Sequence, residues 1–91
     1  MKIKDNIPLK SISGLSKVPD YSPTAIKRLL SRLDLNERAF ALLMNTSPAT
    51  VRMWLNGEAK PCGLSRRLMQ IYDTAPGVIG QIIKVRENTH C

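Results

Sequence analysis

Residues 36–57 constrain the fold of this chain most strongly, because they predict two short helices joined by a tight turn. Asn36 can cap the first of these helices, whose apolar side chains recur at helical spacing. Ser47 can cap the second, and Pro48 suits its first position, where a missing N–H costs nothing. Gly57 is a typical helix stop because it adopts left-handed dihedral angles without strain. Helices this short are unstable alone, so they must share a core.

The two predicted helices divide their side chains between that core and an outer face. The core consists of Phe40, Ala41, Met44, Val51 and Trp54. Ala41 is important here, because a small side chain at a crossing point lets two helix axes approach closely at a steep angle. The outer face of the second helix consists of Pro48, Ala49, Arg52, Met53 and Asn56. This face has no acidic residue, and a helix held outward on a rigid partner fits the major groove of duplex DNA.

The remaining sequence predicts an all-α domain with five helices in total. A helix from Pro23 to Leu33 follows Ser22, its predicted cap. A helix from about Gly63 to Tyr72 is expected to bury Leu64, Leu68, Ile71 and Tyr72 and to expose Arg66, Arg67 and Gln70. A last helix starts near Pro76 and carries the apolar residues Val78, Ile79, Ile82 and Ile83.

Three segments are expected along the chain. Residues 1–20 form a basic extended arm, residues 21–86 the helical domain and residues 87–91 a frayed C-terminus. The arm is broken by Pro8, Gly14 and Pro19 and shows no helical period. Two interpretations of the arm stay open: a basic strand that lies on DNA or on a second subunit, and a disordered leader.

Charge and composition narrow the classes of function. Fourteen Lys and Arg residues against seven Asp and Glu give a net charge of +7, which favours a polyanionic partner. No apolar run approaches the roughly 20 residues that span a bilayer, and no signal-peptide core is present, so we expect a cytoplasmic protein with reduced thiols. Cys62 and Cys91 lack zinc-site spacing, and the single histidine, His90, leaves no nucleophile and base to pair. We therefore expect no metal, no cofactor and no enzymatic activity.

On these residues the chain resembles the helix-turn-helix regulators of the λ-repressor and Cro type, the XRE family, over roughly residues 22–83. The family pattern stands here as Leu35-Asn36, Phe40-Ala41, Met44, Ser47, Thr50-Val51, Trp54, Gly57 and Pro61. The stretch from Pro61 to Tyr72, followed by Ala75-Pro76, is similar to antitoxins of the HigA and MqsA type and to small phage regulators. The resemblance implies a λ-repressor-like domain that binds double-stranded DNA and represses its own operon.

The resemblance also implies which residues read bases. These positions are occupied here by Pro48, Ala49 and Met53, all of them apolar, so thymine methyl groups are their natural partners. Arg52 is the side chain on that face that can make two hydrogen bonds to guanine O6 and N7.

Phosphate contacts are implied at other positions. Asn56 matches a residue that binds backbone phosphate in the family, and Lys60 lies in the loop that runs along the phosphates in relatives. The hydroxyls of Ser47 and Thr50 can add contacts to phosphate or base.

Two departures from the family pattern carry expectations of their own. Glu37 stands where relatives commonly hold a glutamine against a phosphate, so the carboxylate is expected to serve the helix N-terminus and Arg38 to take over the phosphate. Leu30 and Leu55 stand where many relatives carry an Arg–Glu ion pair, so we expect these two leucines to pack together.

A two-fold dimer on a palindromic operator is expected, because one recognition helix reads only about four or five base pairs. The proposed interface is the apolar stripe of Val78, Ile79, Ile82 and Ile83, which is wider than a terminal helix needs. The alternative is that all four residues pack on the helices of their own chain.

Two other functions stay open. An antitoxin would combine the same DNA-binding domain with residues 1–20 as an arm that neutralises a toxin protein. A pure protein-interaction domain of this fold would not need the basic outer face.

Overall fold

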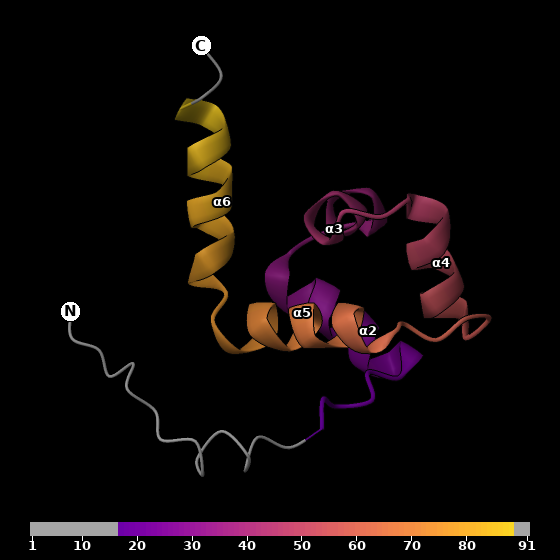
Figure 1. Ribbon diagram of the computed structural model, residues 1–91. Coiled ribbons are helices and arrows are strands. Elements are labelled where there is room, and N and C mark those ends of the chain that lie inside the picture. Colours follow the sequence, from indigo (N-terminus) through magenta and orange to yellow (C-terminus); the bar gives the residue numbers. More distant parts are fainter. Residues whose placement is uncertain (1–16, 89–91) are drawn as a thin grey trace, which may run out of the picture.

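The computed structural model describes the backbone of residues 17–88 and the side chains of residues 17–82. Regular secondary structure in this part of the chain is entirely helical: α2 (Pro23–Leu33), α3 (Glu37–Met44), α4 (Pro48–Asn56), α5 (Gly63–Thr74) and α6 (Gly77–Asn88) (Figure 1). The described chain is therefore all-α, as the sequence predicts. Residues 1–16 of the expected arm and residues 89–91 of the expected C-terminal segment lie outside the described residues. None of the described helices is long and apolar enough to cross a membrane.

Local side-chain chemistry sets the ends of α2, α3 and α4. The helices begin where a polar side chain accepts a hydrogen bond from a backbone amide: Ser22 Oγ from Ala25 at 3.2 Å, Asn36 Oδ1 from Ala39 at 2.8 Å and Ser47 Oγ from Thr50 at 3.1 Å. They end at residues with left-handed dihedral angles, namely Asp34, Asn45 and Gly57. Aspartate, asparagine and glycine are the residues that tolerate this conformation best. All three predicted helix starts are confirmed.

The predicted core of α3 and α4 is also confirmed. Phe40, Ala41, Met44, Val51 and Trp54 are all buried. The turn between the two helices is closed by the Thr46 amide, which donates to the Ala41 carbonyl at 2.9 Å. The small Ala41 side chain lies in the buried cluster, as expected of a residue near a helix crossing. Ile26, Leu29 and Leu30 of α2, Leu55 of α4, and Met69 and Tyr72 of α5 complete this core.

The predicted inner face of α5 is wrong in part. Leu64 and Ile71 are 74% and 42% exposed, whereas Met69 is completely buried. At about 100° per residue, Leu64 and Ile71 lie nearly opposite Met69 on the helix, so one face cannot hold all three. Arg66, which was expected outside, is half-buried, and its Nε donates to the Pro61 carbonyl at 3.2 Å. The core therefore holds Met69 and Tyr72, with Leu68 packed against it as predicted, whereas Leu64 and Ile71 face outward.

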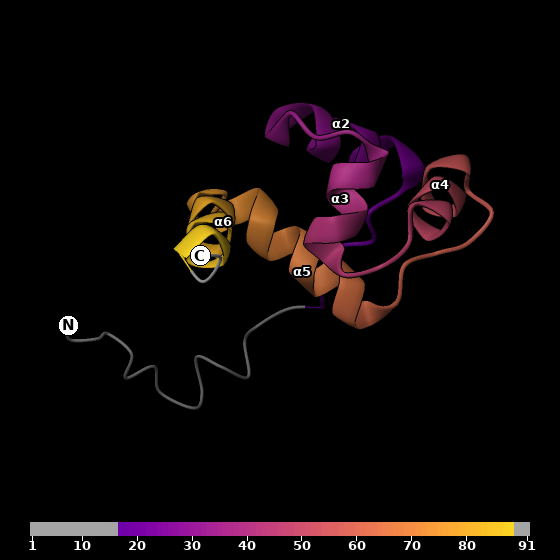
Figure 2. The same cartoon turned by 90° about the horizontal axis from the view of Figure 1, so that it is seen from above.

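α6 leaves the end of α5 and points away from the other helices (Figure 1). In both views it lies at the opposite end of the molecule from α4 (Figure 2). Val78 and Ile79 are half-buried against the core, while Ile82 is 45% exposed. The side chain of Ile83 lies outside the described part. The predicted interface stripe is thus divided, with Val78 and Ile79 packing on their own chain and Ile82 on the surface.

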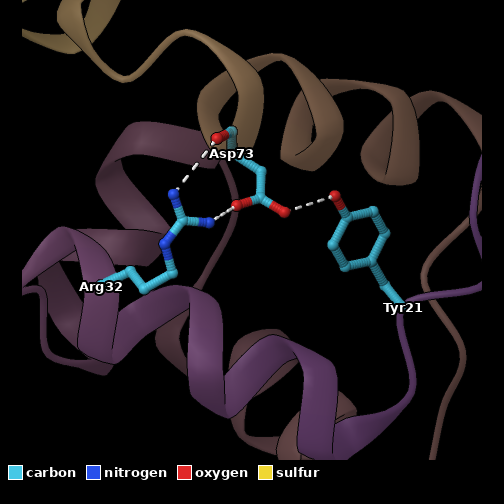
Figure 3. A network of polar contacts seen from close by, with 3 residues as sticks. All are labelled: Tyr21, Arg32 and Asp73. Carbon is cyan, nitrogen blue, oxygen red and sulfur yellow. Dashed lines mark hydrogen bonds and ion pairs between the residues drawn. The ribbon is translucent and has the colours of Figure 1, made fainter.

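A polar network joins the segment before α2 and the last turn of α2 to the end of α5. Tyr21 donates its hydroxyl to Asp73 Oδ2 at 3.2 Å, and Arg32 forms an ion pair with Asp73 Oδ1 (Figure 3). A terminal nitrogen of Arg32 also lies 3.5 Å from the Asp73 carbonyl oxygen. Asp73 therefore connects two segments that are far apart in the sequence, and it fixes the chain immediately before α2.

This network predicts an unusual titration of Tyr21. Burial, the negative charge of Asp73 and the hydrogen bond to Asp73 raise the pKa of Tyr21 from 10.0 to about 12, against an opposing effect of Arg32. Because the folded-state pKa is the higher one, the neutral phenol stabilises the fold below a pH of about 10, and this stabilisation is lost as the pH rises towards 12. Replacing Asp73 with asparagine should lower the pKa of Tyr21.

The measurement is the ultraviolet absorbance of tyrosinate during a pH titration. A Tyr72→Phe background removes the signal of the second tyrosine in the chain. An unchanged Tyr21 titration in Asp73→Asn would show that Asp73 does not raise this pKa.

Candidate nucleic-acid interface

The exposed surface of α4 is formed by the five side chains that the sequence assigns to its outer face. Pro48, Ala49, Arg52, Met53 and Asn56 are all exposed. The opposite side of the helix is fixed in the core by Val51, Trp54 and Leu55. The helix is therefore held by one face and presents the other, which combines a guanidinium group, an amide and apolar side chains.

The start of α4 is held by two hydroxyl groups. Ser47 Oγ accepts from the Thr50 amide and lies 3.0 Å from Thr50 Oγ1. A hydroxyl has one donor and two acceptor positions, so each group keeps capacity for a further hydrogen bond. The structure places both residues at the N-terminal end of the exposed face.

An open groove of about 730 Å³ borders this face. It lies between α2, α3 and α4, and its lining includes three cationic side chains, Lys27, Arg38 and Arg52, and one carboxylate, Glu37. Neither Lys27 nor Arg38 forms an ion pair with any side chain that the structure describes. The groove is therefore positively charged overall and suits an anionic group.

Two leucines form part of the groove wall. Leu30 of α2 and Leu55 of α4 are both buried, and both line the groove. We expect Leu30 and Leu55 to pack together in place of an ion pair, and a Leu55 side chain in solvent would contradict this expectation. Leu55 is instead buried. Lys27 also lines the groove, three residues before Leu30 on α2, at a spacing that puts both side chains on one side of the helix.

Glu37 and Arg52 form an ion pair across the groove. Arg52 Nε lies 3.3 Å from Glu37 Oε1, and both side chains are partly exposed. The sequence predicts Glu37 only at the N-terminus of its own helix, and Glu37 does lie at the first position of α3. The pairing with Arg52, which is 15 residues away, has no signal in the local sequence.

Lys60 lies apart from the groove. It is exposed in the loop after Gly57 and lines a separate pocket of about 430 Å³, together with Trp54, Tyr21 and Arg66. The structure thus brings Arg38 and Arg52 to one groove and leaves Lys60 at another part of the surface.

Cys62 is the cysteine in the described part of the chain. Cys62 is exposed, and hydrogen bonding with Ser65, whose Oγ lies 3.5 Å from the thiol sulfur, lowers the pKa of Cys62. Among the described residues, no three His, Cys, Asp or Glu side chains gather where they could hold a metal ion.

Comparison with known proteins adds no assignment to this geometry. The chain matches no protein-family model, no curated protein and no solved structure. Function is therefore inferred from the exposed face of α4, the adjoining groove and the charge of the chain.

Proposed function

We propose that this protein is a sequence-specific regulator of transcription that binds double-stranded DNA through a λ-repressor-like helix-turn-helix of the XRE type. In this proposal α3 is the supporting helix and α4 the recognition helix. The observation that carries it is the division of α4 into a face fixed in the core by Val51, Trp54 and Leu55 and an exposed face without carboxylates. A recognition helix needs this rigid attachment on one side and a free surface on the other.

The exposed face of α4 has the chemistry to read bases. The major groove offers guanine O6 and N7 as paired acceptors and the thymine methyl group as an apolar contact. Arg52 can supply the two donors that guanine requires. Ala49 and Met53, with Pro48 at the start of the helix, can supply apolar contacts to thymine.

Cationic and polar side chains around the exposed face of α4 supply the sequence-independent part of DNA binding. Lys27 and Arg38 in the groove, and Asn56 at the end of α4, are proposed to contact phosphates, and Lys60 is proposed to reach the backbone from its loop. Binding as a dimer to a palindromic operator would then block transcription from the operator, which makes repression of its own operon the simplest role.

The test is the salt dependence of binding to duplexes from the DNA upstream of its own coding sequence. If each subunit of a dimer meets about four phosphates, log K should fall with log[salt] with a slope of about −7. Fluorescence anisotropy with labelled duplexes measures both this slope and the preference for the upstream fragment over a shuffled one. A flat salt response, or equal affinity for both duplexes, would exclude this function.

Two substitutions separate base reading from phosphate binding. Arg52→Ala should lower the discrimination at one base pair by about 1–3 kcal/mol, because Arg52 is the strong base-edge donor of the exposed face. Asn56→Ala should weaken binding to all sequences alike, because a phosphate contact carries no sequence information. Affinities for operators changed one base pair at a time distinguish the two. Uniform weakening by Arg52→Ala would reassign that side chain to phosphate.

A further inference from the structure

We infer that Glu37 is a positioning residue, which fixes the Arg52 guanidinium so that it can read a G·C base pair. This inference rests on the proposed function, and it assigns sequence specificity to a residue of the supporting helix α3. The ion pair itself joins Arg52 Nε to Glu37 Oε1 at 3.3 Å.

The backbone of Glu37 is held firmly enough for this role. It occupies the first position of α3, directly after the Asn36 cap, whose Oδ1 accepts from the Ala39 amide at 2.8 Å. α3 is fixed to α4 by the buried side chains of Phe40 and Val51. The backbones of Glu37 and Arg52 therefore belong to one packed unit, and recognition groups need such rigid support.

The pairing leaves the recognition end of Arg52 free. Glu37 engages Nε, and among the side chains that the structure describes the two terminal nitrogens of Arg52 form no other hydrogen bond. Bidentate recognition of guanine needs two adjacent N–H donors of the planar guanidinium group. An arginine held through Nε can present Nη1 and Nη2 together in a fixed orientation.

The Glu37–Arg52 ion pair is expected to add little to the stability of the fold. The Arg52 and Glu37 side chains are 58% and 41% exposed, and exposed ion pairs add little to the stability of a fold. An unpaired carboxylate beside a phosphate would repel it, and Arg52 offsets that charge. Holding a long side chain in place before binding reduces the conformational entropy lost when the complex forms. The contact therefore favours recognition more than folding.

The experiment compares Glu37→Ala with Glu58→Ala. Both variants remove one carboxylate, partly exposed in Glu37 and exposed in Glu58, but Glu58 forms no ion pair with any described side chain. Affinities are measured for the preferred upstream duplex and for duplexes changed at the base pair that Arg52→Ala identifies. Glu37→Ala should lower discrimination at that pair by about two- to tenfold, as expected from freeing one long side chain. Glu58→Ala should leave it unchanged, and adding Glu37→Ala to Arg52→Ala should cause no further loss.

A second measurement does not depend on DNA. The Arg52 Nε–H resonance of the free protein should shift and exchange faster with solvent in Glu37→Ala, and it should stay unchanged in Glu58→Ala. Glu37→Gln, which keeps an acceptor of the same reach, serves if Glu37→Ala does not fold, and it should cause a smaller loss of discrimination.

The outcomes separate the inference from the function on which it rests. If the wild-type protein shows no preference among duplexes, the proposed function fails. If the wild type discriminates and Arg52→Ala abolishes the discrimination, but Glu37→Ala and Glu37→Gln retain it in full, DNA binding stands and the positioning role is wrong. Stronger binding by Glu37→Ala with intact discrimination would show that Glu37 only competes with DNA for Arg52.

Discussion

Replacing Phe40 with alanine is expected to destabilise the fold by about 3–5 kcal/mol, the usual cost of removing a buried aromatic ring. Phe40 is completely buried, within the cluster shared by α3 and α4. Domains have a total stability of only about 5–15 kcal/mol, so this loss approaches the whole stability of a small one. Urea denaturation followed by circular dichroism measures the change in the free energy of unfolding.

Leu42→Ala is the matched control, because Leu42 lies on the same helix but is 72% exposed. A surface substitution of this kind should change stability by no more than about 0.5 kcal/mol. DNA binding at low temperature should then be weakened by Phe40→Ala and retained by Leu42→Ala. Equal destabilisation by the two variants would mean that Phe40 does not hold α3 against α4.

The helix boundaries and the α3–α4 core could be predicted because short-range chemistry determines them. The caps at Ser22, Asn36 and Ser47 bond to amides three residues further along, so both partners lie within one short stretch of sequence. The exposed face of α4 followed from the same logic, since the positions left over from the core must face outward.

The face of α5 could not be predicted in the same way. Hydrophobicity alone predicts that Leu64 and Ile71 are buried in preference to Met69. Which side of α5 is covered depends instead on the surfaces of α2, α3 and α4. Methionine fills irregular spaces well because its side chain is flexible, so its burial is poorly marked in a sequence. Arg66 is then half-buried on the same helix, and its guanidinium group donates to the Pro61 carbonyl.

Long-range polar pairs were missed for a related reason. Tyr21 and Asp73 are 52 residues apart, and Arg32 and Asp73 are 41 residues apart. The pairing of Glu37 with Arg52 depends on the angle at which α3 packs on α4, which no local pattern specifies. The residues of the candidate site could therefore be predicted from the sequence. The Glu37–Arg52 ion pair could not, because it depends on how α3 packs on α4.

Ile82→Asp is expected to dissociate the proposed dimer and to reduce operator affinity by at least about 100-fold, because linked half-sites gain their combined affinity from simultaneous binding. Ile82 is the better test position of the predicted stripe. Val78 and Ile79 pack on the core, so a charge at either would also destabilise the monomer, whereas Ile82 is 45% exposed. Sedimentation velocity measures the oligomeric state, and circular dichroism checks that the helices remain.

Gln81→Asp is the control for charge, since Gln81 is the exposed neighbour of Ile82 on α6. It should leave both the dimer and operator binding nearly unchanged. α6 and α4 lie at opposite ends of the molecule in Figures 1 and 2, so a contact between two α6 helices leaves the exposed faces of α4 free for DNA. A folded Ile82→Asp monomer that no longer binds the operator would support α6 as the interface. A dimer that survives this substitution would move the interface to the N-terminal arm or to the loop after Gly57.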